Sequence, residues 1–215
     1  MAESPRQQRD EVRDALDRLL KAIDAWAGDR REGSSNRGKL AILRRGLRPA
    51  DRFDAERFAL IDEYVKGEID ESDERLLHEV TALCALHPRI ERTPTAESSL
   101  TRANFGNTLA AVYPAAHPRR RGVARRLTFV LSGTRAEVLQ RLLPLFRQLH
   151  GDAPDHPVNY LILFRDVRSW DSDDRWVQRA WARSFWGGLA VEPRELAETS
   201  DASNDETTTN DDPDN

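Results

Sequence analysis

Residues 12–28 read VRDALDRLLKAIDAWAG, and this stretch decides the fold class. Its apolar side chains recur every three or four positions, at Val12, Leu16, Leu19, Leu20, Ile23 and Trp26. Arginine and aspartate fill most of the positions between them, so one apolar stripe runs along a helix. Gly28 follows the last apolar position, as is common where a helix ends. The stretch therefore predicts an amphipathic α-helix.

The same spacing recurs along the rest of the chain. It predicts further helices over residues 39–46, 58–67, 76–87, 100–112, 119–131, 134–149, 155–170 and 171–186. No segment alternates apolar and polar residues for long enough to predict a strand. We expect an all-α, compact bundle of about eight or nine helices, arranged as one body or as two packed lobes.

Several residues mark the expected helix ends. Thr134 and Glu137 have the spacing of a capping box, and Pro144 in the same helix is expected to kink it. Residues 155–157, Asp-His-Pro, resemble a helix start with proline in the first turn. Residues 171–174 contain three aspartates, which would favour the start of the last helix through its dipole.

The composition predicts one helical domain over residues 1–191 and an acidic tail over residues 192–215. A chain of 215 residues that is 39% hydrophobic can bury one substantial core. The tail has no aromatic residue and nine acids against Arg194, so we expect it to be disordered. The lone Cys84 and the absence of a long apolar run predict a cytoplasmic protein without a membrane segment.

Charge is separated along the predicted helical domain. The net charge of the chain is −4, but the tail alone contributes −8, so residues 1–191 carry +4. Residues 30–49 hold seven basic residues and one acid, and residues 119–147 hold eight arginines and one acid. Residues 51–79, by contrast, hold eleven acids and four bases. Such separation is typical of a protein that binds a polyanion with one face.

Two groups of basic residues are the candidate contacts to nucleic acid. The first group is Lys39, Arg44 and Arg45, and the second is Arg119, Arg120, Arg121, Arg125 and Arg126. Guanidinium groups bind phosphate oxygens in a bidentate manner and stay charged at every relevant pH. The alternative is that these arginines form surface salt bridges with the acidic segment over residues 51–79.

The sequence contains no complete catalytic or metal-binding motif. Residues 33–39 have the spacing of a phosphate-binding P-loop, but Leu40 stands where a serine or threonine would hold magnesium. The five histidines are scattered, and acidic pairs such as Asp173 and Asp174 are adjacent rather than convergent. We expect no enzymatic activity, no cofactor and no metal site.

Cys84 and the tryptophans are expected to be core residues. Cys84 shares a helical stripe with Leu77 and Val80, where a reactive thiol would not be found. The helical spacing of Trp170 and Trp181 favours packing over base stacking.

Six short motifs together resemble a known family. They are Leu43-Arg44-Arg45 with Pro49, Leu83 to Pro88, Phe105-Gly106, Arg125-Arg126-Leu127, Asp166 to Trp170, and Trp181-Ala182-Arg183 with Phe185. In order and spacing, from Val12 to Trp186, the chain resembles CasB, the small subunit of the type I-E CRISPR surveillance complex called Cascade.

The resemblance implies a non-catalytic, all-helical subunit that contacts the backbone and large subunits, a second copy of itself, crRNA and target DNA. In that family the basic surface is held to stabilise the R-loop, including the displaced non-target strand. The matching positions are Arg44, Arg45, Arg125 and Arg126, with Lys39 and Arg135 as neighbours. The chain departs from the family at residues 142–144, where relatives often carry Leu-Arg-Arg, and Arg141 and Arg147 are expected to compensate. A purely structural adaptor whose arginines bind acidic protein partners remains the alternative.

Overall fold

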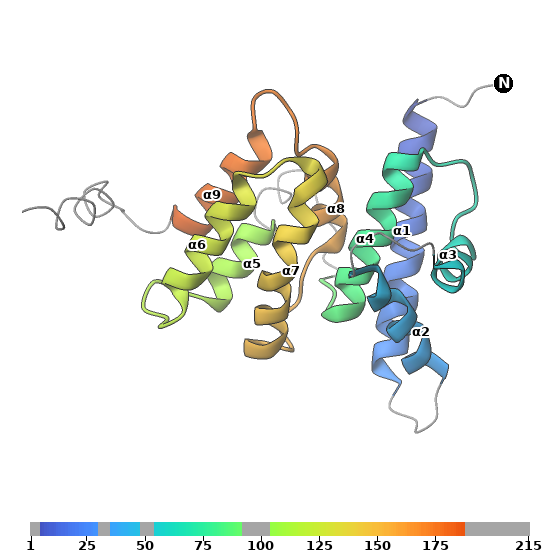
Figure 1. Cartoon of the computed structure of the whole chain (residues 1–215), viewed down its shortest axis with the longest axis horizontal. Helices are drawn as coiled ribbons and strands as arrows, with labels where there is room; N and C mark the ends of the chain where they lie inside the picture. Colours follow the sequence, from blue (N-terminus) through green and yellow to red (C-terminus); the bar gives the residue numbers. More distant parts are fainter. Residues whose placement is uncertain (1–4, 30–34, 48–53, 92–103, 188–215) are drawn as a thin grey trace, which may run out of the picture.

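The computed structural model describes residues 5–29, 35–47, 54–91 and 104–187 (Figure 1). Nine α-helices and one short 3₁₀ helix occur in these ranges: α1 (Pro5–Gly28), α2 (Ser35–Arg44), η1 (Arg45–Leu47), α3 (Ala55–Asp62), α4 (Glu71–Leu86), α5 (Phe105–Val112), α6 (Arg120–Leu131), α7 (Arg135–Asp152), α8 (Tyr160–Arg168) and α9 (Trp176–Trp186). The β pairing within these ranges is a single isolated parallel bridge between Ile90 and Val158. The predicted all-α class is confirmed.

The helices form two packed groups, which we call the N-lobe (α1 to α4) and the C-lobe (α5 to α9) (Figure 1). In the N-lobe, α4 packs against both α1 and α2. In the C-lobe, α5 packs on α9 and α6 packs on α7. Helix α4 also contacts α7 and α8, so it lies between the two lobes and joins them.

The predicted apolar stripes form the core. Leu16, Leu19 and Ile23 of α1 are almost completely buried, and Cys84 has no exposed surface. Trp170 and Trp181 are also fully buried and meet edge to face, with ring centroids 5.1 Å apart. The placement of these residues in the core is therefore confirmed, whereas Trp176 and Trp186 are only half-buried.

The predicted capping box at the start of α7 is confirmed. The backbone N–H of Thr134 donates to Oε2 of Glu137 at 3.0 Å, which satisfies a group that the helix itself leaves unbonded. Helix α7 continues through Pro144 to Asp152. Helix α1 ends at Gly28, as the sequence predicted.

One predicted helix start is wrong, and another lies a few residues later than predicted. Residues 155–157 precede α8, which begins after Asn159, whose side chain accepts from the N–H of Ile162 at 3.0 Å. The reason is the isolated bridge: Val158 donates to the carbonyl of Arg89 and is held in extended backbone. Helix α9 begins at Trp176, after Arg175 at φ 49°, but the predicted negative charge does lie at its start, because the backbone N–H of Trp176 donates to Oδ1 of Asp174 at 3.3 Å.

Other boundaries differ by about one turn. Helix α3 ends at Asp62, short of the predicted Gly67, and α2 begins at Ser35 rather than Lys39. The predicted tail over residues 192–215, the first residues of the predicted 100–112 helix, and Gly33 and Ser34 lie outside the described residues. None of the described helices is both long and apolar enough to cross a membrane.

His78 of α4 is a buried ring without a polar partner among the described residues. Only 4% of it is exposed, its ring centroid lies 4.2 Å from that of Phe58, and neither ring nitrogen is hydrogen-bonded. Burial, together with the charge of Arg57, lowers the pKa of His78 from 6.5 to about 4. Between pH 6.5 and about pH 4, His78 is therefore protonated in the unfolded chain and neutral in the folded chain. The stability linked to His78 is therefore complete above pH 6.5 and is lost as the pH falls towards 4.

We expect His78→Leu to remove this pH dependence. The free energy of unfolding of the variant, relative to that of the wild type, should rise by on the order of 2 kcal/mol between pH 7.5 and pH 5. Urea unfolding of both proteins at the two pH values measures this change. A difference between variant and wild type that stays constant with pH would contradict the assigned shift.

Candidate nucleic-acid interface

The three basic candidates of the N-lobe have different surroundings. Lys39 lies over the ring of Trp26, with Nζ 5.0 Å from the centroid. Arg44 is exposed, and its Nε donates to the carbonyl of Ala85 at the end of α4 at 2.8 Å. This contact orients Arg44 but does not neutralise its charge, because its partner is a backbone carbonyl.

Arg45 is paired with acids of residues 51–79, the acidic segment that was expected to form salt bridges if the arginines did not bind nucleic acid. Its Nη1 lies 2.6 Å from Oε2 of Glu56 and 3.6 Å from Oδ2 of Asp54. The hydrogen bond that Arg45 donates to Glu56 is the main cause that raises the pKa of Arg45. The charge of Arg45 is therefore largely neutralised within the N-lobe, and a phosphate would have to compete with these acids for it.

Arg119 and Arg120 hold the start of α6 to the rest of the C-lobe. Arg119 forms an ion pair with Asp152 at the end of α7. Arg120 donates to the carbonyls of Tyr113 and Phe185, and its guanidinium lies 4.1 Å from the centroid of the Phe185 ring. Burial lowers the pKa of Arg120. Both residues therefore have structural partners.

The next three arginines of α6 face solvent. Arg121, Arg125 and Arg126 are exposed, while Val123 and Leu127 of the same helix are fully buried, as the sequence predicted. Arg126 donates from Nη1 to Oε1 of Gln148 on α7 at 2.9 Å. Arg121 and Arg125 have no hydrogen bond or ion pair in the described part of the chain.

Arg135 and Arg141, the remaining candidates, are tied to neighbouring residues. Arg135 lies 4.0 Å from Asp73 of α4. Arg141 lies 3.0 Å from Glu137, and its Nη1 donates to the carbonyl of Phe129 at 2.7 Å, leaving 18% of its side chain exposed.

Arg147, the other residue expected to compensate for the departure at residues 142–144, is different. It is exposed on α7 and has no ion pair or hydrogen bond to any described residue. Of the two residues, Arg141 is paired with Glu137, whereas Arg147 has no acid as a partner in the described ranges.

The ends of α4 and α7 and the start of α6 lie towards one end of the molecule. Helices α4 and α7 run in the same direction, since Arg135 lies near Asp73 at their starts and His150 packs against His87 at their ends. Helix α6 runs the opposite way, because its first residues meet the end of α7. The end of α4, the end of α7 and the start of α6 all lie in the lower half of Figure 1.

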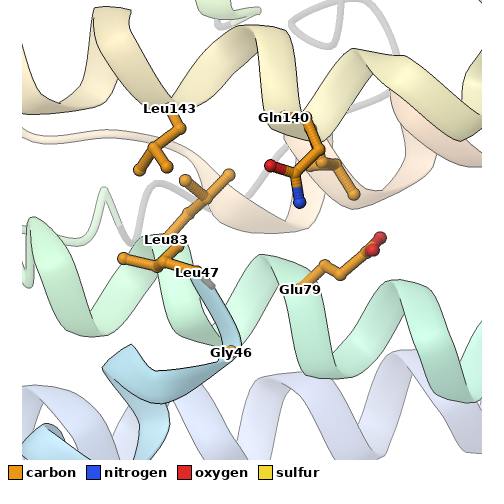
Figure 2. Close-up of a pocket in the computed structure, with 7 residues that line it drawn as sticks. Gly46, Leu47, Glu79, Leu83, Gln140 and Leu143 are labelled. Atoms are coloured by element: carbon orange, nitrogen blue, oxygen red, sulfur yellow. The ribbon is translucent and has the colours of Figure 1, made fainter. Parts of the chain in front are cut away.

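The contact between the lobes places Arg147 between the two basic groups. Leu47 of η1, Leu83 of α4 and Leu143 of α7 meet in a small crevice between the helices, and Figure 2 shows Leu143 pointing towards the other two. Arg147 follows Leu143 by four residues, so it lies one turn further along the same side of α7. Arg44, bonded to Ala85, lies just beyond Leu83.

We call these five residues the basic track. Ordered from the N-lobe to the C-lobe, they are Arg44, Arg147, Arg126, Arg125 and Arg121. The track follows α2, α7 and α6 past the end of α4, and each of its members is exposed. No carboxylate of the described residues forms an ion pair with any of them. Exposed guanidinium groups of this kind can bind phosphate oxygens.

Three other kinds of site can be compared with the geometry: a phosphate-binding loop, a ligand pocket and a metal site. From Ser35 to Lys39 the P-loop-like segment is helical, and the loop geometry of a phosphate site is not formed there. The crevice in Figure 2 measures about 10 Å³, roughly the space of one water molecule. Within the described ranges, no three His, Cys, Asp or Glu side chains gather closely enough to hold a metal ion.

Phe129 of α6 is a residue that the sequence reasoning missed. It is 58% exposed, the one large hydrophobic side chain to be exposed in the described ranges. A signal was present, because Phe129 follows Arg125 by four residues and so falls on the arginine face, away from the Val123 and Leu127 stripe.

The sequence of the chain was compared with known protein families, and it matches one of them. Residues 39–186 match the family of the CRISPR-associated protein Cse2. No curated protein matches the chain.

Solved structures share its fold. CasB of M. ruber is 21% identical over 83% of this chain and 94% of its own, with a TM-score of 0.57. A chain of a CRISPR RNA-guided surveillance complex is 22% identical over 81% and 92%, with a TM-score of 0.55. CasB from Thermus thermophilus is 23% identical over 80% and 97%, with a TM-score of 0.51.

Proposed function

Because the chain belongs to the CRISPR-associated Cse2 family, we propose that it is a non-catalytic subunit of a type I-E RNA-guided surveillance complex, Cascade, and that it stabilises the R-loop. Its partners are then the backbone and large subunits, a second copy of itself, crRNA and target DNA, in the cytoplasm of the cell. A solved neighbour of the same fold is a chain of a CRISPR RNA-guided surveillance complex, which supports membership of such a complex.

The observation that carries the proposal is the basic track. Arg121, Arg125 and Arg147 are exposed and have no described partner, so a phosphate oxygen would not have to displace an existing ion pair. Arg44 and Arg126 are held by neutral acceptors and keep their charge available. A displaced single strand is charged and flexible, and a line of fixed cations can hold it without reading its bases.

The energetic reason is that R-loop formation is nearly balanced. The guide heteroduplex is about as stable as the DNA duplex that it replaces, so a few backbone contacts are enough to favour the open state. In this mechanism the track holds the displaced strand away from its complement. Re-formation of the DNA duplex is slowed, and no bond is made or broken by the chain.

The structural adaptor is the second candidate, and the pairing of Arg45 with Glu56 and of Arg119 with Asp152 favours it. The charges of these two arginines are neutralised by acids of the same chain. In the adaptor, the remaining basic residues would contact acidic surfaces of other protein subunits. An adaptor of this kind would have no affinity for a polyanion.

Binding of the full chain to labelled single-stranded DNA, measured across a salt series, separates the two candidates. We expect binding that weakens as salt rises, with a slope of log K against log salt of about −0.7 for each phosphate contacted. Five contacts along the track would give a slope of about −3.5. Absence of binding at low salt, or affinity that does not change with salt, would favour the adaptor and contradict the proposed role.

A further inference from the structure

We propose that Phe129 is a stacking platform for an unpaired base, and that the α6 surface therefore takes single-stranded rather than duplex nucleic acid. This inference rests on the proposed function and names the form of nucleic acid that the track prefers. Phe129 is not a member of the basic track, which consists of arginines alone.

The ring of Phe129 is exposed and supported from one side. More than half of its surface is accessible, at 58%, and the guanidinium of Arg141 lies 4.1 Å from the ring centroid. Arg141 is itself fixed by the carbonyl of Phe129 at 2.7 Å, Oγ of Ser132 at 3.1 Å and Oε1 of Glu137 at 3.0 Å. The ring is thus backed by a held cation, and its remaining exposed surface is available to a ligand.

The ring continues a line of free cations. Arg121, Arg125 and Phe129 follow one another at steps of four residues along α6, so they share one face of the helix at intervals of about 6 Å. The two arginines are exposed and have no partner among the described residues. A strand whose phosphates lie on Arg121 and Arg125 therefore has its next base within reach of the ring.

The chemistry favours an unpaired base over a protein surface as the occupant. Phe129 is the one large apolar side chain exposed in the described ranges, and its neighbours on α6 include Arg126 and the exposed Thr128. A protein-docking site needs a contiguous apolar patch with a buried centre, which a single ring among cations does not supply. Every unpaired base, by contrast, has a π face, and a duplex keeps its bases stacked on each other.

The test compares Phe129→Ala, Phe129→Leu and Phe129→Trp in the full chain. Each is measured by fluorescence anisotropy against a single-stranded oligonucleotide and a duplex of equal length. We expect Phe129→Ala and Phe129→Leu to weaken single-strand binding about tenfold, and Phe129→Trp to bind as tightly as the wild type or more tightly. Duplex affinity and the salt slope should not change, because no charge is removed.

A second measurement gives a direct readout of contact. A single strand carrying a photoreactive base should crosslink to the peptide that contains Phe129 in the wild type, and the yield should fall in Phe129→Ala. Circular dichroism melting checks that the exposed substitution leaves the fold intact.

A matched variant separates this inference from the proposed function. Arg121→Gln with Arg125→Gln should weaken single-strand and duplex binding alike and reduce the salt slope by about 1.4 for the single strand. If that variant weakens binding while Phe129→Ala does not, only the stacking inference is wrong. If neither variant has an effect, the proposed function is wrong as well.

Two further outcomes would overturn the stacking inference. One is that Phe129→Leu binds a single strand as tightly as the wild type, since leucine keeps apolar contact but has no π face. The other is that Phe129→Ala changes sedimentation of the protein and not its DNA affinity, which would assign Phe129 to contact between copies.

Discussion

Reversal of charge at Arg121, Arg125 and Arg147 to glutamate is expected to lower single-strand affinity at least about a hundredfold near 0.1 M salt. The reason is that each phosphate contact to a single strand contributes about 0.7 to the salt slope, and three contacts are lost together. Repulsion between the new carboxylates and the phosphates adds to the loss. The three side chains have no described partner, so the fold should not change.

The control for this variant removes the same charge at the other end of the N-lobe. Arg13, Lys66 and Arg75 are exposed, and reversing them to glutamate changes the net charge by the same amount. We expect this control to bind nearly as tightly as the wild type. In the assembled complex, the lifetime of the R-loop should fall for the track variant and not for the control. Equal losses in both variants would mean that net charge, rather than the track, governs binding.

Trp181→Ala is expected to destabilise the protein by about 4 kcal/mol or more. Trp181 is fully buried between Trp170 and Phe105, and truncation of such a side chain leaves a cavity that the core cannot fill. Its Nε1 also donates to Oδ2 of Asp166 at 2.7 Å. The variant therefore leaves a buried carboxylate oxygen without that donor, which adds a further cost.

Trp186→Ala, in the same helix, is the matched control. Trp186 is half-buried and contacts Phe185 edge to face at 5.0 Å, so its removal should cost about 1 kcal/mol. The free energies of unfolding in urea, compared for both variants, measure the difference. Similar losses for the two tryptophans would contradict a core centred on Trp181.

The periodic apolar stripes made most of the helices predictable. Helix α1 is the clearest example, because its stripe and Gly28 are local signals that do not depend on the rest of the fold. The capping box of Thr134 and Glu137 is equally local. The start of α8 was not predictable in this way, since Val158 is held by Ile90, which is far from it in the sequence.

The basic groups were found from composition, and the alternative of salt bridges to residues 51–79 names the right segment for Arg45 but not for Arg119, which pairs with Asp152. Arg45 and Arg119 look like Arg44 and Arg121 in the sequence, and only the fold brings Glu56 and Asp152 against the first two. Arg147 was named only as a compensating residue, and its exposure depends on how α7 packs on α4. Non-local packing therefore decides which cations remain for a ligand.

Because the basic track spans both lobes, a nucleic acid bound along it would raise the thermal stability of the protein. Arg44 belongs to one side of the α4 and α7 contact, and Arg147 to the other. A nucleic acid that contacts both residues would bind only the native arrangement of the two lobes and would therefore stabilise it. By mass action, saturation at a hundred times the dissociation constant would then add about 2.7 kcal/mol to the unfolding free energy. Within such an assembly, the subunit would be most resistant to heat while it holds an open strand.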